Sequence, residues 1–282
     1  MHNQPELTNI AREFSVKNKL QVLEFAGKGA FKETYCVVDV KKNKIALKLI
    51  SSKKYNPSRS KREINALLKC DTSLIGKIYD FGEFAASDSH KYYFSLEEYL
   101  DGGTLTDKIS DNILTIDLIK KYSITLVQAV EYLRTKNLVH RDIKPDNIMF
   151  RSNADEPVLV DLGIVRDLNE TSLTQSWLPQ GPGTPFFSSP EQLNNDKNLI
   201  DWRSDQFSLG IVLGICLTDK HPFEEPGMNE WDVVQSMANR NTCSKIFENK
   251  IGTFGLKKMV KMIAPWPIQR HQRVEDLTKI FI

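Results

Sequence analysis

The chain has 282 residues, of which 40% are hydrophobic and 26% are charged, as in ordinary globular proteins. Its formal net charge of +2 gives no reason to expect a nucleic-acid or membrane surface. No apolar run approaches the roughly 18 residues of a membrane span, and the first residues lack an apolar signal core, so we expect a cytoplasmic protein. The four cysteines lie far apart and are expected to be reduced thiols.

The first part of the chain is predicted to be β-rich. Residues 1–15 are expected to form a polar leader. Short runs rich in β-branched and aromatic residues follow, separated by turn-forming or charged residues, which predicts an antiparallel sheet with strands over 20–25, 34–39, 45–50, 78–84 and 92–96. One helix is expected at about 58–70, because Ile64, Leu67 and Leu68 form a single apolar stripe.

The periodicity becomes helical from about residue 104. Apolar residues recur at helical spacing over 116–136, and a second apolar helix is expected over 205–217. Gly102 and Gly103 separate the two patterns and supply a flexible hinge. The sequence therefore predicts a β-rich lobe over 16–101 and a mainly helical lobe over 102–282.

The first candidate motif lies between the first two expected strands. It contains two glycines, and glycines between strands let backbone N–H groups approach phosphate oxygens closely. The pattern by itself is also that of an ordinary β-turn. The motif reads Gly27-Lys28-Gly29-Ala30-Phe31-Lys32-Glu33-Thr34.

A lysine on the third expected strand is the second candidate. Alternation places Ala46 and Lys48 on one face of that strand. A lone lysine in such a place is usually a solvated strand residue. Glu63 lies fifteen residues later in the expected helix, and a Lys–Glu pair would hold the ammonium group against phosphates.

The third motif is the most specific and reads His140-Arg141-Asp142-Ile143-Lys144-Pro145-Asp146-Asn147. Asp142 supplies a carboxylate for an attacking hydroxyl, and Lys144 supplies a cation for a phosphoryl group in transfer. Asn147 supplies a side-chain oxygen for a metal ion. A coincidental polar loop with all three groups in this order would be rare.

Three further motifs follow in the chain. Asp161-Leu162-Gly163 comes directly after an apolar run over 158–160, and an aspartate at a strand end suits a Mg²⁺ ligand. Gly183-Thr184-Pro185 and Ser189-Pro190-Glu191 come next. Asp205 stands at the start of an apolar helix, where a buried carboxylate can accept backbone N–H bonds and fix the loop that carries Asp142.

The six motifs and their order resemble the eukaryotic-type (Hanks-type) serine/threonine protein kinase domain, from about Phe25 to the end of the chain. The resemblance implies an α+β, bilobal protein-kinase-like fold. A small antiparallel β lobe with one helix would precede a larger, mainly helical lobe. The resemblance also implies transfer of the γ-phosphoryl group of ATP, with Mg²⁺, to serine or threonine hydroxyls of protein substrates, including the kinase itself.

The resemblance further implies a role for each motif residue. Ala26 and the eight residues after it would cover the nucleotide, while Lys48 and Glu63 would position its phosphates. Asp142 would be the catalytic base with Lys144 beside it, and Mg²⁺ would be held by Asn147 and Asp161. Lys144 is typical of the serine/threonine group. An ion pair is also expected between Glu191 and Arg270.

Two residues depart from the family pattern. Lys32 replaces the third glycine of the glycine-rich loop and would either reach the phosphates or, as we prefer, point to solvent. Glu97 falls where the family gates the back of the nucleotide pocket with an apolar residue or threonine, and a buried unpaired carboxylate would be costly. Either Lys48 pairs with Glu97, or the alignment slips by one residue or a local bulge intervenes, with Leu96 as the gate. We prefer the second interpretation.

Three function classes fit these motifs. An active protein kinase is favoured, because every charged catalytic position is filled. A pseudokinase that binds nucleotide without efficient transfer is the alternative. A small-molecule kinase with a related two-lobed fold would lack the segment 183–191.

The resemblance also implies regulation in the segment 161–191. Autophosphorylation is expected there at Ser176 or Thr174, because the related kinases bind such a phosphate with the arginine that corresponds to Arg141. Arg59 and Arg166 stand where further partners are common. Solvated arginines, or a direct bond from Gln180 to Arg141, are the alternatives.

Overall fold

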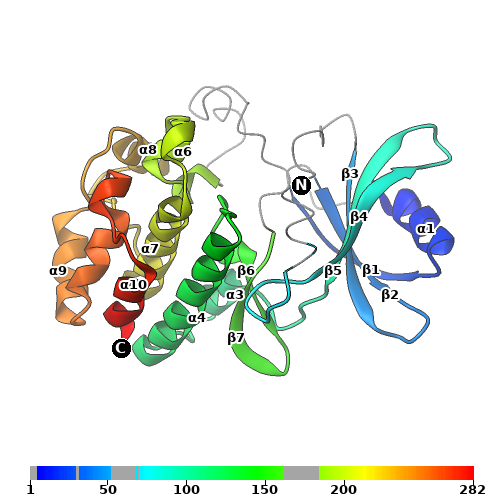
Figure 1. Ribbon diagram of the computed structural model, residues 1–282, viewed down its shortest axis with the longest axis horizontal. Helices are drawn as coiled ribbons and strands as arrows, with labels where there is room; N and C mark the ends of the chain where they lie inside the picture. Colours follow the sequence, from blue (N-terminus) through cyan, green and yellow to red (C-terminus); the bar gives the residue numbers. More distant parts are fainter. Residues whose placement is uncertain (1–4, 30–31, 52–67, 69, 162–183) are drawn as a thin grey trace. The chain divides into compact units, whose positions relative to one another are not determined.

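The computed structural model describes residues 5–29, 32–51, 68, 70–161 and 184–282. The chain divides into two compact units, Met1–Asp101 and Gly102–Ile282, both drawn in Figure 1. We name the first the β unit and the second the helical unit. The division falls at the pair of glycines where the sequence pattern changes.

The β unit is built on a five-stranded antiparallel sheet with the strand order β1-β2-β3-β5-β4. All five expected strands are present, because their β-branched and aromatic residues suit a pleated, half-buried surface. β2 pairs with β3 without a register shift from Lys32↔Ile50 to Val38↔Lys44. The strands are β1 (Gln21–Lys28), β2 (Lys32–Val38), β3 (Lys44–Ser51), β4 (Ile78–Ala85) and β5 (Lys91–Glu98).

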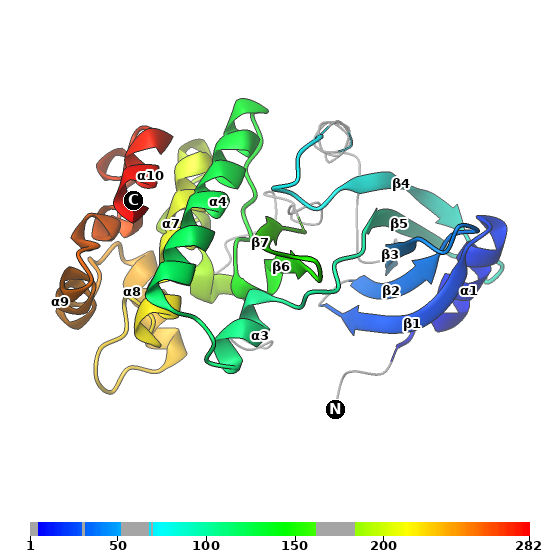
Figure 2. The ribbon, with the colours of Figure 1, turned by 90° about the horizontal axis from the view of Figure 1, so that it is seen from below.

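A helix, α1 (Thr8–Lys17), covers one face of this sheet, as Figures 1 and 2 show. Its Ile10, Ala11 and Phe14 are buried in a core that includes Leu47 of β3. The prediction of a polar leader over 1–15 is therefore wrong. The reason is that Ile10 and Ala11 lie four and three residues before Phe14, so the three side chains form one apolar stripe on a mainly polar helix. The expected helix at 58–70 lies outside the described residues, apart from Leu68 and Cys70.

The helical unit combines a two-stranded sheet with α-helices and 3₁₀ turns. The expected helices over 116–136 and 205–217 are confirmed as α4 and α7. The elements are α3 (Leu105–Ser110), α4 (Ile116–Thr135), η3 (Pro145–Asn147), β6 (Ile148–Arg151), β7 (Ala154–Leu159), η4 (Thr184–Phe187), α6 (Pro190–Leu193), η5 (Lys197–Leu199), α7 (Trp202–Thr218), α8 (Glu230–Ala238), α9 (Lys245–Thr253), η6 (Lys257–Ile263), η7 (Pro267–Gln269) and α10 (Val274–Phe281).

Helix α7 forms the centre of the helical unit. It is buried on all sides over most of its length, and α4 and η6 pack against it. Gly210 permits the close approach of η6, because a Cβ atom at that position would lie 2.6 Å from Ile263 Cγ2. The buried helix α7 can therefore support the residues that form contacts with its first turn.

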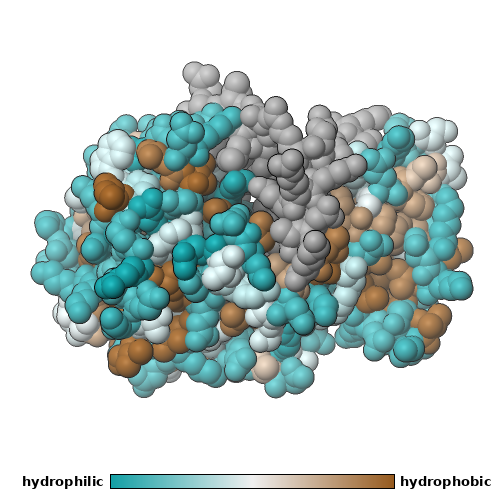
Figure 3. All heavy atoms as spheres, viewed as in Figure 1, coloured by the Kyte–Doolittle hydropathy of each residue, from teal (hydrophilic) through white to brown (hydrophobic). Residues whose placement is uncertain are grey.

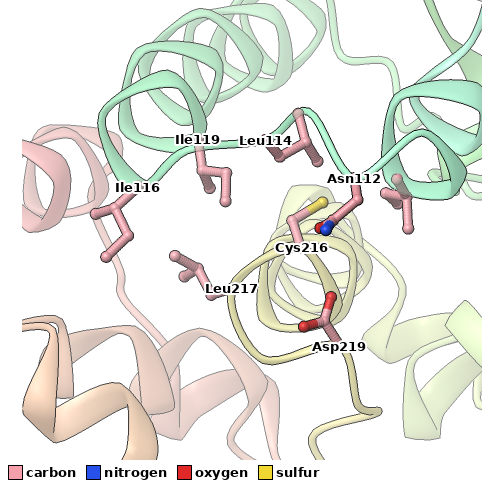
Figure 4. A pocket seen from close by; sticks show the side chains of 8 residues that line it. Asn112, Leu114, Ile116, Ile119, Cys216, Leu217 and Asp219 are labelled. Atoms are coloured by element: carbon pink, nitrogen blue, oxygen red, sulfur yellow. The ribbon is translucent and has the colours of Figure 1, made fainter.

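A small pocket of about 130 Å³ lies in the helical unit between α3, the start of α4 and the end of α7. Figure 4 shows its lining, which is mainly aliphatic and includes the thiol of Cys216. All four cysteines are free; Cys36 and Cys243 are buried, and Cys216 is partly buried.

Within the described part of the chain, none of the helices combines the length and the apolar character needed to traverse a bilayer. Figure 3 shows that hydrophilic side chains cover much of the helical unit on the face drawn, with apolar ones singly or in small groups.

Candidate active site

Helix α7 fixes the loop that carries Asp142, through hydrogen bonds to the loop backbone. One carboxylate, that of Asp205, accepts hydrogen bonds from the backbone N–H groups of His140 (2.8 Å) and Arg141 (2.8 Å). Arg141 takes a left-handed conformation, with φ of 66°, which costs a non-glycine residue on the order of 1 kcal/mol. The two bonds to a buried carboxylate offset that cost, and the prediction for Asp205 is confirmed. Burial raises the pKa of Asp205, and the two amides oppose the increase.

Three predicted site residues lie together in this loop. The side-chain amide of Asn147 donates to the backbone oxygen of Asp142 (2.8 Å) and to its carboxylate Oδ2 (3.0 Å). Lys144 Nζ lies 3.5 Å from the same Oδ2. The 3₁₀ turn η3 brings Asn147 back toward Asp142. The backbone N–H of Asn147 donates to the carbonyl of Lys144 within this turn. A carboxylate, an ammonium group and an amide oxygen are thus held within one short loop.

His140 connects this loop to the strand that precedes Asp161. The amide of Asp142 donates to His140 Nδ1 at 3.3 Å, so Nε2 carries the proton and donates to the carbonyl of Val160 at 3.0 Å. The amide of Val160 in turn donates to the backbone oxygen of Asn147 at 3.0 Å. Asp161 follows directly in a left-handed conformation, with φ of 67°. The loop and Asp161 are therefore linked through the backbone of one residue.

Asn147 and Asp161 suit a magnesium ion by their donor chemistry. The Asn147 amide nitrogen is turned to Asp142, so its carbonyl oxygen remains as the ligand atom, and Asp161 adds a carboxylate. Mg²⁺ prefers such oxygen ligands and usually shares them with phosphate and water. Among the described residues no cluster of three or more His, Cys, Asp or Glu could hold a metal alone. The rest of the shell would thus come from a phosphate-bearing substrate and water.

In the β unit, Lys48 forms an ion pair with Glu97. Lys48 Nζ lies 2.6 Å from Glu97 Oε2, and the two side chains are 12% and 11% exposed. The hydroxyl of Ser95 donates to the other oxygen, Oε1, at 2.6 Å. These contacts explain how a carboxylate is tolerated at this buried position.

The preferred one-residue slip at Glu97 is therefore wrong, and the ion-pair alternative is correct. β3 and β5 pair regularly, with Lys48 opposite Ser95 and Leu47 opposite Leu96. Residues opposite each other share a face of the sheet, so Leu96 lies with Leu47 on the α1 face. A local bulge does occur here, between Ile78 and Asp80 opposite Glu97 and Leu96, but it lies in the pairing of β4 with β5 and leaves Glu97 on the same face as Lys48.

The glycine-rich motif forms the hairpin of β1 and β2. Lys28 pairs with Glu33 and Gly27 with Thr34, while the Gly29 amide bonds to the Lys32 carbonyl at 2.9 Å. Of the predicted nucleotide-binding residues, Ala26, Gly27 and Lys28 lie in β1 and Lys32, Glu33 and Thr34 in β2. Ala30, Phe31 and Glu63 lie outside the described residues.

The last two residues of this motif, Glu33 and Thr34, face opposite sides of the sheet. Thr34 pairs with Lys48 and shares its face, whereas Glu33 pairs with Leu49 on the α1 face. The side chain of Glu33 is therefore directed away from Lys48. It accepts hydrogen bonds from the backbone before α1 instead, so the predicted contact of Glu33 with a nucleotide would have to come from its backbone.

The expected ion pair of Glu191 and Arg270 is confirmed and fully buried. The two N–O distances are 2.6 and 2.9 Å, and both side chains are 0% exposed. Arg270 also donates to backbone oxygens, including that of Ala264, and Ser204 donates to Glu191 at 2.6 Å. Burial raises the pKa of Glu191, but Arg270 and Ser204 outweigh burial and hold the pKa below its usual value.

Sequence reasoning missed one contact of the same region. Gln192 donates from its side chain to the backbone oxygen of Arg141 at 2.8 Å, which ties α6 to the loop of Asp142. Its carbonyl end closes a capping box with Ser189. The spacing Ser189-x-x-Gln192 could have indicated the cap, but no sequence signal indicates the bond to Arg141.

This fold and this arrangement of loop residues define a protein kinase domain. The family model described as "Protein kinase domain" matches residues 20–277. The chain therefore belongs to the protein kinase family, and the predicted α+β, bilobal kinase-like fold is confirmed.

Individual relatives refine this assignment. The serine/threonine-protein kinase PknA of Nostoc is 30% identical over 73% of this chain and 38% of its own length. The probable serine/threonine-protein kinase PknB of Bifidobacterium longum is 30% identical over 73% of this chain and 31% of its own. The serine/threonine-protein kinase CHK1 of Saccharomyces cerevisiae is 30% identical over 64% of this chain and 35% of its own length. These relatives place the chain among the serine/threonine protein kinases, although it spans only about a third of their length.

Proposed function

We propose that the chain transfers the γ-phosphoryl group of ATP, in the presence of Mg²⁺, to serine or threonine hydroxyls of protein substrates. One observation carries the proposal: the loop of Asp142, Lys144 and Asn147 is hydrogen-bonded to Val160, which is the residue directly before Asp161. A structural role alone does not require these four groups in one place. Proteins in the cytoplasm are the proposed substrates.

Each residue has a defined part in this reaction. Asp142 would orient the attacking hydroxyl and accept its proton. Lys144 would neutralise charge that develops on the phosphoryl oxygens. Asn147 and Asp161 would hold Mg²⁺, which supplies charge neutralisation of the phosphates when bound. Lys48 and the glycine-rich hairpin would position the phosphates in the β unit.

The pseudokinase alternative is less well supported. Pseudokinase function would be favoured by the loss of a charged catalytic group, whereas Asp142, Lys144, Asn147 and Asp161 are all present. A small-molecule kinase is disfavoured by the segment 184–191, whose Glu191 is anchored in the core by Arg270.

The test compares Asp142→Asn with Asp146→Asn in a radiolabelled ATP assay on a generic protein mixture. Asp146 is a matched control, because it lies in the same loop and its carboxylate accepts a hydrogen bond from Thr106 in α3. Removal of a general base costs on the order of 100-fold or more in kcat, so Asp142→Asn should lose transfer. It should keep nucleotide binding, and Asp146→Asn should keep both. Transfer by Asp142→Asn above about a tenth of the wild-type rate would exclude Asp142 as the base.

We also propose autophosphorylation at Ser176 or Thr174, which lie outside the described residues. A phosphate of about −1.5 to −2 charges there would bind Arg141 and order the segment. Mass spectrometry of the protein before and after phosphatase treatment tests this. Equal activity of the two samples, assayed before re-phosphorylation, would contradict a switch.

A further inference from the structure

The glycine-rich hairpin is joined to the segment before α1 by one carboxylate. Glu33, at the start of β2, is only 3% exposed. Its two oxygens accept hydrogen bonds from the backbone N–H groups of Glu6 (2.9 and 3.1 Å) and Leu7 (2.9 Å). The hydroxyl of Tyr35 donates to Oε2 at 2.6 Å. A residue within the glycine-rich motif thus holds the entry to α1.

The charges around this contact favour an ionised carboxylate. Lys28, on the paired strand β1, lies 2.6 Å from Glu6 Oε1 and 3.5 Å from Glu33 Oε1. Burial alone would raise the pKa of Glu33. The hydrogen bonds from Tyr35, Glu6 and Leu7 and the charge of Lys28 together hold the pKa below its usual value.

Helix α1 is itself fixed to the rest of the sheet, so it can act as a support. Phe14 packs on Phe84 and Phe94, with ring centroids 5.2 and 4.6 Å apart. Near the far end of α1, the carboxylate of Glu13 accepts bonds from the amide and hydroxyl of Ser87, beyond β4. The helix therefore connects the glycine-rich hairpin to the opposite part of the sheet.

We propose that Glu33 is a positioning residue for the nucleotide, which latches the glycine-rich hairpin to α1 and holds it ready to bind ATP. This inference rests on the proposed function of the hairpin. Glu33 lies on the α1 face, opposite to Thr34 and Lys48, so it acts on the nucleotide only through the hairpin backbone.

The physical basis is pre-organisation. A hairpin that contains two glycines loses conformational entropy when it closes on phosphates. Fixing β1 and β2 in advance reduces that loss and so strengthens binding. Breaking the latch should therefore weaken nucleotide affinity and leave the catalytic loop of the other unit unaffected.

The experiment uses Glu33→Gln in the full chain, with Glu13→Gln as the matched control at the other end of α1. Both remove one carboxylate charge from a contact of the same helix with the sheet. Glu33→Gln should raise the Mg·ATP dissociation constant and KM about fivefold or more, with kcat within about twofold. Glu13→Gln should change neither by more than about twofold. Equal effects of the two variants on KM would overturn the inference.

A second readout does not depend on nucleotide. Hydrogen exchange of the free protein should quicken over residues 21–38 in Glu33→Gln but not in Glu13→Gln, and unchanged exchange there would overturn the latch. If Glu33→Gln does not fold, Tyr35→Phe replaces it, because it removes only one donor to Glu33 and should shift KM and exchange in the same direction. A wild-type protein that bound no Mg·ATP would instead overturn the proposed function. In that case hydrogen exchange would still show whether Glu33 fixes the hairpin to the segment before α1.

Discussion

Glu97 stabilises a buried positive charge in the β unit. Its pair with Lys48 is about one-tenth exposed, and loss of one partner from such a pair leaves an uncompensated charge. We predict that Glu97→Gln lowers the free energy of unfolding by about 1–3 kcal/mol and weakens kcat/KM for ATP about tenfold. Urea denaturation and steady-state kinetics measure the two effects.

Ser95→Ala is the control for Glu97, because it removes only the hydroxyl donor to Oε1. It should cost about 1 kcal/mol or less in stability. The double variant Lys48→Met with Glu97→Gln should lose less unfolding free energy than the sum of the losses in the two single variants. Strict additivity would show that the two side chains do not interact.

Asn147 and Asp161 are predicted to set the magnesium dependence of the reaction. Asn147→Ala and Asp161→Ala each remove an oxygen ligand, so the Mg²⁺ concentration for half-maximal activity should rise about tenfold or more. Asn112→Ala, in an exposed turn, serves as a control. If both site variants reached half-maximal activity at the same Mg²⁺ concentration as the wild type, these residues would not be the metal ligands.

At the level of single residues, contacts could be predicted where one short motif contains its own partners, or where the family resemblance supplies the pair, as for Glu191 and Arg270. Asp142, Lys144 and Asn147 lie within six residues of each other in the chain, so their proximity in space follows from their spacing. Glu97 and Glu33 are different, because Lys48 lies on another strand and the amides bound by Glu33 lie in the segment before α1. Which face of the sheet each carboxylate occupies depends on strand register, and a single sequence does not specify it.

Helix α1 is an integral part of the β unit, and its stability is open to direct measurement. Phe14 is 1% exposed, whereas Val16, two residues later, is 78% exposed. We predict that Phe14→Ala lowers the free energy of unfolding of the β unit by about 3–5 kcal/mol. Val16→Ala should change it by about 0.5 kcal/mol or less. A thermal or urea unfolding curve that gave similar values for the two would mean that α1 does not stay on the sheet.

Elements differ in how well the sequence predicts them. The strands β1 to β5 were predicted from short runs rich in β-branched and aromatic residues, α4 from apolar residues at helical spacing, and α7 from a continuous apolar run. Helix α1 was missed because only three of its apolar side chains are buried in ten residues, among charged neighbours. Its partners, such as Phe84 and Phe94, lie about 70 to 80 residues later in the chain, so the sequence around α1 gives little sign that it is covered.

In the whole helical unit, Glu191 and Arg270 connect α6, α7 and the segment after η6. The folded pKa of Glu191 is lower than its usual 4.5, so the unfolded chain binds this proton more readily. The pair therefore contributes stability above about pH 4.5, and this contribution is lost as the pH falls through the folded pKa. We predict that acidification below pH 4.5 destabilises the helical unit.

Glu191→Gln tests this assignment. The variant should lose about 3–5 kcal/mol at pH 7 and show a smaller further loss on acidification than the wild type. Glu248→Gln removes a partly exposed carboxylate that pairs with Lys245 and should leave the acid transition in place. Denaturation curves at pH 7, 5 and 4 would show the difference, and parallel acid profiles of Glu191→Gln and the wild type would contradict the role of this pair.

The burial of the cysteines has a practical consequence for chemistry on this chain. Burial raises the pKa of Cys216 to about 12 and that of Cys243 to about 11, and it also raises the pKa of Cys36. Because the thiolate is the reactive form, these three thiols should be poor nucleophiles at neutral pH. A cysteine introduced at an exposed position, such as Val16 or Ile268, should react with a maleimide dye well before them. Fluorescent labels could then be attached to either unit without first replacing these three native cysteines.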